Sequence, residues 1–318
     1  MTLRLATLLA LIAPAAAAAQ GYPVKPIRVV VAFAPGGIAD FSARSVSQKL
    51  AESLGVPVVV ENRPGAGGIT GAEIVAKSPP DGYTLLVTSI SHTINPSVRK
   101  NLPFDALRDF AAVTLITDAP NLLVVHPSLP ARSVRELVAL ARARPGQISY
   151  ASSGAGTSTH LSGELFKALA RVDIVHVPYK GGGPAVIDLV GGHVQMMFST
   201  LPSVLQQVRA AKLRGLAVTG ARRFPAAQEF PTMIEAGIAG YEVSGWSGLF
   251  APAGTPRDAL GRLAAEIGRI LRAPELKERF FAQGAEPVGN SPEVFSAFVN
   301  SEVTKWKKVV ELSGTRAD

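Results

Sequence analysis

The sequence predicts an α/β protein built as two lobes, and three observations support this fold class. First, near-continuous apolar runs at residues 27–33, 56–60 and 84–88 alternate with helical patterns at 40–54 and 69–76. Such runs are typical of strands that are buried on both faces. Second, the strand–helix–strand order implies a parallel sheet with helices on its faces. Third, the order recurs after residue 121, and about 300 residues are enough for two lobes of ordinary size.

The second unit begins with an expected strand at 122–125 and a helix at 133–144. Ser133 is the expected N-cap of this helix, and Glu136 follows three residues later, which forms a capping box. Further strands are expected at 147–151, 173–177, 195–198, 214–219 and 248–252, and further helices at 159–169, 184–190, 202–210, 256–272, 274–283 and 292–311.

This order indicates that the second lobe is inserted into the first. Lobe 1 is then expected to comprise residues 22–121 and 246–318, and lobe 2 residues 122–245. The chain would cross between the lobes near Asn121 and within 241–248. Two crossings make a hinge, which allows the lobes to close around a ligand.

Residues 1–20 have the pattern of a secretory signal peptide. Arg4 precedes an unbroken apolar run at 5–19, which ends in a series of alanines. A charged start, a short apolar stretch and an A-x-A site predict export, with cleavage near Ala19. The alternative is a retained membrane anchor, which needs roughly 20 apolar residues. We therefore expect a protein that is secreted into the periplasm.

The composition excludes several functional classes. Hydrophobic residues make up 47% of the chain and charged residues 18%, which is typical of a globular protein. The chain has no cysteine, so thiol catalysis and thiolate metal sites are excluded. The net charge is +8, or +7 without Arg4, but Lys and Arg are scattered along the chain. We expect a basic surface that attracts anionic ligands and no nucleic-acid binding.

The first candidate binding loop is Ala34-Pro35-Gly36-Gly37-Ile38-Ala39-Asp40, between the first expected strand and helix. Adjacent glycines let the backbone approach a ligand closely. The following helix presents unpaired N–H groups and a positive dipole end, which together predict an anion site. An ordinary tight turn has the same signature. Asp40 either stabilises the helix dipole or holds an ammonium or hydroxyl group of the ligand. The candidate binding residues here are Ala34, Pro35, Gly36, Gly37 and Asp40.

A second loop of the same kind occupies the corresponding place in the second unit, at residues 152–160. It contains two glycines and five hydroxyl side chains ahead of a helix. Open α/β sheets bind ligands at the carboxyl ends of their strands, so the two loops are expected to face each other and bridge a carboxylate or dicarboxylate. The candidate binding residues here are Ser152, Ser153, Gly154, Gly156, Thr157 and His160.

Three further candidates follow two other expected strands, one in each unit. Ser89 and Ser91 come after the strand at 84–88 and are candidate hydroxyl donors. Tyr179 stands shortly before three glycines, where it either closes over a ligand or donates its hydroxyl to one, or instead packs at an interface. Lys180 and His92 are better explained as solvated or structural side chains.

The sequence does not favour an enzyme. Residues 65–70 contain Gly-x-Gly, but they lack the third glycine of a dinucleotide-binding loop and follow the second strand. The histidines form neither H-x-x-x-H nor H-E-x-x-H, so we expect no metal and no other cofactor. The remaining alternative is a secreted hydrolase with Ser153 as nucleophile and His160 as base. No G-x-S-x-G nucleophile elbow supports it.

A series of short motifs runs along the whole mature chain. They are Pro26-Ile27-Arg28, Pro35-Gly36-Gly37-x-x-Asp40, Glu61-Asn62-Arg63-Pro64-Gly65-Ala66-Gly67-Gly68, Asp81-Gly82-Tyr83-Thr84, Ile94-Asn95-Pro96, Leu102-Pro103-Phe104-Asp105, Asp109-Phe110, Ser153-Gly154-x-Gly156-Thr157-x-x-His160-Leu161, Val177-Pro178-Tyr179-Lys180-Gly181, Leu213-Arg214-x-Leu216-Ala217-Val218-Thr219, Pro231-Thr232, Glu235-Ala236-Gly237 and Phe250-Ala251-Pro252-x-Gly254-Thr255-Pro256. Each motif is weak alone. In this order the chain resembles the Bug-type (TctC-like) extracytoplasmic solute receptors, the binding components of tripartite tricarboxylate transporters.

The resemblance implies a type II periplasmic binding protein fold, in which two lobes close on a ligand like a Venus flytrap. Family ligands include citrate-like acids, dicarboxylates, acidic amino acids and aromatic acids, held by the two Gly/Ser loops and often by water. The implied partners are the membrane permease subunits of the transporter or, in a signalling role, a sensor kinase.

The sequence departs from the family pattern at Gln195. Gly192-His193-Val194-Gln195 stands where the family often has Gly-x-Val-Asp. Phe198 and Ser199 follow, and the resemblance implies that they line the cleft. We expect the departure to affect the choice of ligand rather than the fold. The ligand's identity is expected to depend on the walls around Tyr179, residues 195–199 and Trp246.

Overall fold

The computed structural model describes residues 21–313, so the predicted signal peptide at 1–20 lies outside the described residues. In chain order the strands are β1 (Ile27–Val31), β2 (Val58–Asn62), β3 (Thr84–Ser89), β4 (Phe110–Val125), β5 (Ser149–Ser152), β6 (Val175–Pro178), β7 (Met196–Thr200), β8 (Arg214–Val218), β9 (Ser244–Pro252) and β10 (Glu286–Pro287). The helices are α1 (Ile38–Leu54), α2 (Ile69–Ala76), α3 (Ser91–Val98), α4 (Val134–Ala143), α5 (Ser158–Ala170), α6 (Gly182–Val190), α7 (Leu201–Arg209), α8 (Arg257–Arg272), α9 (Pro274–Ala282) and α10 (Pro292–Ser313), with short 3-10 helices η1 (Ala66–Gly68) and η2 (Pro225–Ala227).

The strands form one continuous network with two parts, sheet A and sheet B. In sheet A, β1 lies between β2 and β3 and is parallel to both, while β9 joins β3 to β4 in antiparallel pairing. In sheet B, β5 is parallel to β6 and β7, and β7 and β8 pair antiparallel with β4. The strand–helix–strand order read from the sequence therefore does form parallel pairs in both parts.

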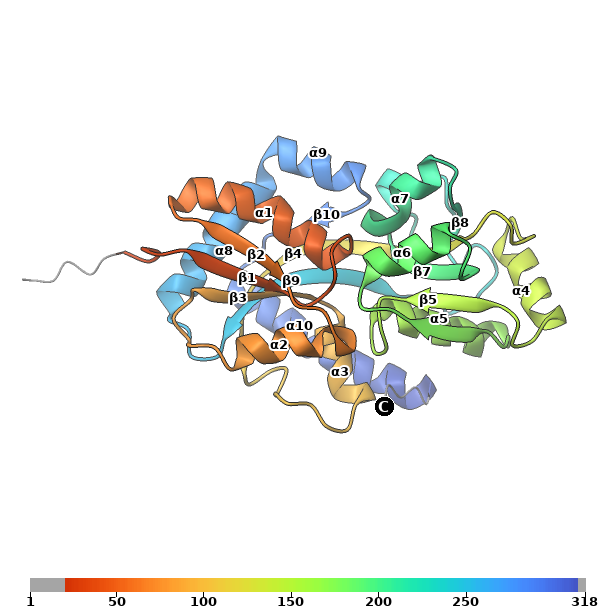
Figure 1. Ribbon diagram of the computed structural model, residues 1–318, viewed down its shortest axis with the longest axis horizontal. Helices are drawn as coiled ribbons and strands as arrows, with labels where there is room; N and C mark the ends of the chain where they lie inside the picture. The colour runs from red at the N-terminus through yellow and green to blue at the C-terminus, as the bar shows by residue number, and fades with distance from the viewer. Residues whose placement is uncertain (1–20, 314–318) are drawn as a thin grey trace, which may run out of the picture.

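Strand β4 belongs to both sheets. Residues 110–120 pair with β9 in sheet A, whereas Asn121 and the residues after it pair with β7 and β8 in sheet B. The chain returns at Val243, whose N–H donates to the Thr219 carbonyl of sheet B just before β9 begins. Figure 1 shows β4 and β9 running together through the middle of the elongated molecule. We refer to sheet A with α1–α3 and α8–α10 as side A, and to sheet B with α4–α7 as side B.

Burial follows the helical period on the covering helices. In α8 the buried residues include Ala259, Leu263, Ile267, Ile270 and Leu271, which share one face, while its arginines point outward. This face packs against α1 and β4. The α4 prediction is also confirmed, since the Ser133 hydroxyl caps the helix by accepting from the Glu136 N–H at 3.1 Å.

The structure contains elements that the sequence patterns did not predict, among them α3, β10 and most of β4. No helix was predicted at residues 91–98, where α3 is short and contains Pro96. Only the last four residues of β4 were expected as a strand, because Pro120 reads as a break. Here Pro120 pairs with Ser244 at the end of the β4–β9 ladder, and β4 shifts register after Ala112 and Leu115.

Candidate ligand-binding cleft

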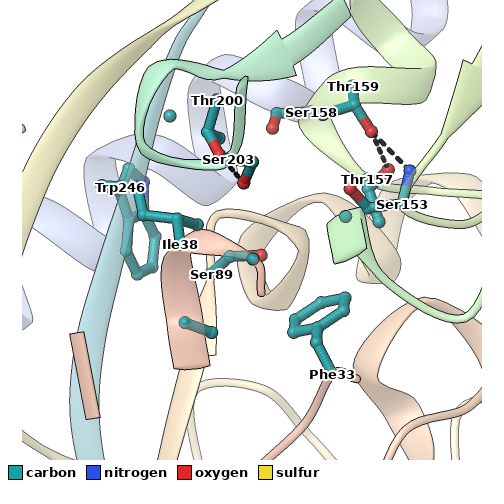
Figure 2. A pocket seen from close by; sticks show the side chains of 14 residues that line it. Phe33, Ile38, Ser89, Ser153, Thr157, Ser158, Thr159, Thr200, Ser203 and Trp246 are labelled. Carbon is teal, nitrogen blue, oxygen red and sulfur yellow. Dashed lines mark hydrogen bonds between the residues drawn. The ribbon is translucent and has the colours of Figure 1, made fainter. Parts of the chain in front are cut away.

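A small cavity lies between side A and side B, at the carboxyl edges of β1, β3, β5 and β7 (Figure 2). Its lining residues come from both sides: Phe33, Gly37, Ile38, Ala39, Ser89, Gly245 and Trp246 from side A, and Ser153, Thr157, Ser158, Thr159, Gly182, Thr200 and Ser203 from side B. None of these fourteen residues carries a charged side chain. A ligand held here would therefore meet backbone groups, hydroxyls and apolar surface.

Four helices begin at this cavity. Gly37 is the N-cap of α1, Thr157 is the N-cap of α5 and Thr200 is the N-cap of α7, while Gly182 is the first residue of α6. The first N–H groups of a helix have no intrahelical acceptor, and each N-terminus carries roughly +0.5 of an elementary charge. Four such ends correspond to about two positive charges around one cavity. The site is suited to an anion although no cation lines it.

The loop before α5 uses some of its hydroxyls to hold its own shape. The Thr157 hydroxyl donates to the Gly154 carbonyl at 2.7 Å and accepts from the His160 N–H at 3.4 Å. Since its proton is engaged, Thr159 must be the donor in the 2.9 Å contact between the two threonines. The Ser153 N–H in turn donates to the Thr159 hydroxyl. Both threonines are thus committed to the loop.

Other hydroxyls keep a proton for a ligand. Within the described chain, no hydrogen bond engages the hydroxyls of Ser153 or Ser158. Thr200 and Ser203 share one hydrogen bond of 2.9 Å, and Ser89 shares one of 3.1 Å with Ser91. A pair that shares one bond still has one unused O–H donor. The cleft therefore offers hydroxyl donors chiefly from side B.

The loop before α1 is held from behind by Asp40. One carboxylate oxygen of Asp40 accepts from the Gly36 N–H at 3.1 Å, and the other accepts from Arg44 Nε and Asn62 Nδ2, both at 2.9 Å. Asn62 Nδ2 also donates to the Phe33 carbonyl. Asp40 is 5% exposed and does not line the cavity. Its carboxylate supports the loop rather than facing a ligand.

Side A supplies the apolar part of the wall. Phe33, Ile38, Ala39 and Trp246 all line the cavity, and in Figure 2 Phe33 and Trp246 lie at opposite ends of it. Side B supplies the four hydroxyl residues of the α5 loop described above together with Thr200 and Ser203. The cleft is thus asymmetric, with an apolar face opposite a hydroxyl-rich face.

The two sides are in contact around the cavity. The Ala34 N–H donates to the Lys180 carbonyl at 3.2 Å, which joins side A to side B through backbone alone. Gly36 packs on Gly183, and a Cβ on Gly67 would overlap the Ala155 carbonyl. The cavity volume is about 30 Å³, enough for one or two waters but not for an organic acid. This conformation is closed.

His160 does not act on Ser153. Its Nδ1 accepts from the Gly156 N–H at 3.2 Å, and its ring stacks on His176 with 4.0 Å between centroids. Burial lowers the pKa of His160, more than the neighbouring Glu164 raises it. His160 is therefore a neutral ring that shapes the loop. Among the described residues no hydrogen bond joins it to Ser153, so the hydrolase alternative has no geometric support.

The predicted site residues fall into three groups. Gly37, Ser89, Ser153 and Thr157 line the cavity. Ala34, Pro35, Gly36, Gly154 and Gly156 belong to the same two loops and lie at or near the contact between the sides. The remaining predicted residues lie behind the wall or away from it: Asp40, Ser91, Ser152, His160, Tyr179, Phe198 and Ser199.

Each residue of the last group has a structural partner or a core position. Tyr179 donates its hydroxyl to Asp188 at 2.6 Å, and the Ser152 hydroxyl contacts His176 at 2.6 Å. Phe198 packs between Phe166 and Tyr241 and is fully buried in the core. Ser199 is fully buried beside it.

Gln195 also lies away from the cavity. Its side-chain oxygen accepts from the N–H and the hydroxyl of Ser149, both at 2.8 Å, at the amino end of β5. The departure from the family pattern at this position therefore ties two strands together and does not reach the ligand wall.

Six of the cavity residues absent from the sequence predictions share one signal. Phe33, Thr200 and Ser203 stand at or just beyond the carboxyl end of a strand, as do Ser158, Thr159 and Gly182. The rule that open α/β sheets bind ligands at this edge applies equally to β7, and applying it there would have found Thr200 and Ser203.

Within residues 21–313 no group of three His, Asp or Glu side chains is placed to hold a metal ion. Across the same residues the structure has no helix with both the length and the apolarity needed to cross a bilayer.

Two solved structures with bound acids superimpose closely on this fold. R. palustris Rpa4515 with adipate is 38% identical with a TM-score of 0.90, covering 92% of this chain and 98% of that one. MatC from Rhodopseudomonas palustris with bound malate is 33% identical with a TM-score of 0.87, covering 91% and 100%. Two α/β sides that meet over a polar cleft therefore define a periplasmic binding protein, which confirms the predicted fold class.

Sequence comparisons agree with this class. Residues 42–315 match the model of the tripartite tricarboxylate transporter family receptor. Protein BugT of Bordetella pertussis is 39% identical over 300 residues, covering 94% of this chain and 92% of BugT. The chain belongs to the tripartite tricarboxylate transporter receptor family, whose members are periplasmic solute-binding receptors and not enzymes. The resemblance read from the motifs is confirmed.

Proposed function

We propose that this protein captures a small organic acid in the cleft between side A and side B and delivers it to a membrane permease. The observation that carries the proposal is the convergence of four helix N-termini on one cavity whose lining has no charged side chain. Their combined charge of about +2 matches a dicarboxylate. The adipate and malate of the two related structures are both dicarboxylates, which supports this class.

The ligand is proposed to be an acid without an ammonium group. An acidic amino acid needs a carboxylate or several free acceptors for its ammonium, because a buried unpaired charge is costly. Asp40 is the nearest carboxylate in the loops, and both its oxygens already accept hydrogen bonds from protein groups. The apolar wall of Phe33, Ile38 and Trp246 suits a carbon chain instead.

Capture is proposed to proceed by closure of two lobes with the boundaries expected from the sequence. Residues 22–121 and 246–318 would form one lobe and residues 122–245 the other. The two strands that join the sheets, near Asn121 and Val243, would serve as the hinge. Residues 1–20 would direct export, and the permease of a tripartite tricarboxylate transporter would be the partner, as the family implies.

A thermal-shift panel of matched pairs tests the ligand class. The mature chain, beginning at Gly21, is heated with succinate, aspartate, glutarate, glutamate, malate and adipate at several concentrations. A bound acid should stabilise the fold by about 2.7 kcal/mol at a hundredfold excess over Kd. The proposal expects a shift with at least one dicarboxylate and a smaller shift with its amino counterpart. Larger shifts with the amino acids would overturn the ligand class.

A further inference from the structure

The two tryptophans of the chain share one acceptor. Trp246 Nε1 and Trp306 Nε1 both donate to Glu302 Oε2, at 3.1 and 3.0 Å. All three residues are buried, with Glu302 5% exposed and each tryptophan 1% exposed. The second oxygen of Glu302 lies 3.5 Å from Lys305 Nζ. Because a carboxylate bound by two N–H donors is held firmly, Glu302 is fixed within α10.

Trp246 connects this cluster to the cleft. It lies on β9 and lines the cavity (Figure 2), whereas Glu302 lies on α10 and is not part of the cavity lining. Phe295 and Phe298 pack edge-to-face against the indole, with ring centroids 5.8 and 5.6 Å away. Edge-to-face pairs occur over a range of ring separations, roughly 4.5–7 Å, so these contacts alone do not fix the depth of the indole. The hydrogen bond to Glu302 is the directional contact that sets how far the indole extends toward the cavity.

We propose that Glu302 is a positioning residue of the ligand site, which acts through Trp246 to set the length of carbon chain that the cleft accepts. The proposal rests on the function proposed above. An indole held at one depth gives the apolar wall a fixed end, so acids of different length fit unequally. Without the carboxylate the indole is free to slide, and the end of the cavity becomes adjustable.

The competing explanation is that Glu302 only anchors α10 to the sheet. The bond from Trp306 to Glu302 allows these two roles of Glu302 to be tested separately. Trp306 is one turn further along the same helix and does not line the cavity. A Trp306→Phe chain keeps the Glu302–Trp246 bond and makes Trp246 the only indole. It serves as the reference protein and allows Trp246 to be followed by its fluorescence.

The experiment compares Trp306→Phe with three double variants that add Glu302→Ala, Glu302→Asp or Glu302→Gln. Kd is measured for the dicarboxylates from malonate to adipate, together with the Trp246 emission spectrum. The Ala variant is expected to lose about tenfold in affinity for the best acid, to discriminate less between chain lengths and to change its emission. Gln retains an oxygen acceptor and is expected to restore the reference profile.

The Asp variant keeps the test decisive if the Ala variant does not fold. The Asp side chain is one methylene shorter, so its carboxylate lies closer to the α10 backbone. The preferred chain length of the acid should therefore shift while the charge remains. An unchanged length profile in folded Ala or Asp variants would overturn the positioning role. If the reference protein itself binds no acid, the proposed function fails instead.

Discussion

Gly183 at the start of α6 lies directly against the carbonyl of Pro35, the residue that precedes the two glycines of the α1 loop. A Cβ on Gly183 would overlap this oxygen, and Gly36 packs on the Gly183 backbone from the same loop. Pro35 belongs to side A and Gly183 to side B. The closed cleft therefore depends on backbone-to-backbone contact that only glycine permits at this point.

Gly183→Ala is expected to impair closure without harming either side. Gly183 has no positive φ, so alanine suits its helical backbone, and the overlap arises only when the sides meet. Acid affinity should fall by about tenfold or more, while the open protein gains the helix preference of alanine. Isothermal titration and small-angle scattering measure both effects. Gly261→Ala in α8, whose Cβ would meet nothing within 4 Å, is the matched control and should bind normally.

Ser153→Ala and Ser203→Ala should each weaken acid binding with little effect on unfolding. Both hydroxyls face the cavity and are not needed to hold the α5 loop. A hydrogen bond to a charged group contributes about 1.5–3 kcal/mol, so a tenfold or greater rise in Kd is expected. Ser296→Ala, on the exposed face of α10, is the control. Normal affinity in both cleft variants would show that the hydroxyls do not contact the acid.

Asp40→Asn distinguishes the two roles predicted for that residue. The oxygens of Asp40 accept hydrogen bonds from Gly36, Arg44 and Asn62. We therefore expect a loss of about 1–3 kcal/mol in unfolding free energy and a lower affinity for every acid. The ratio of succinate to aspartate affinity should stay constant. A selective loss of aspartate binding would instead place Asp40 against a ligand ammonium.

His92 should make the fold less stable in mild acid. Burial lowers the pKa of His92 to about 4, although its bond to the Ala106 carbonyl opposes the shift. The unfolded chain binds a proton below pH 6.5 that the folded chain does not. The contribution of neutral His92 to the free energy of unfolding is therefore fully present above pH 6.5. It falls by about 3 kcal/mol as the pH drops toward 4.

Urea unfolding at pH 7 and pH 4.5 measures this loss. His92→Gln keeps a donor for Ala106 but does not titrate, so its stability should differ less between the two pH values than that of the parent. Phe104→Leu, in the same aromatic cluster, is destabilised at both values alike and serves as the control. An equal pH response in His92→Gln would remove His92 as the cause.

The strands and loops that depend on a local sequence pattern could be predicted from the sequence. Apolar runs located β1, β3, β5 and β7, and the glycines before α1 and α5 located both loops, since each signal lies within a few adjacent residues. The sequence did not reveal which face of a strand turns toward the cleft. Phe198 and Thr200 are two residues apart on β7, yet Phe198 packs in the core, whereas Thr200, the last residue of β7 and the N-cap of α7, lines the cavity. Trp246 and Glu302 meet only through tertiary packing.

Titration calorimetry of an acid against its neutral amide tests the central claim most directly. The mature chain is titrated with succinate or adipate, whichever gives the larger thermal shift, and with the corresponding diamide of the same length. The helix N-termini should bind the acid at one site per chain, with no detectable heat from the diamide. Equal binding of the two compounds, or no heat from any dicarboxylate, would contradict capture of an organic acid by this cleft.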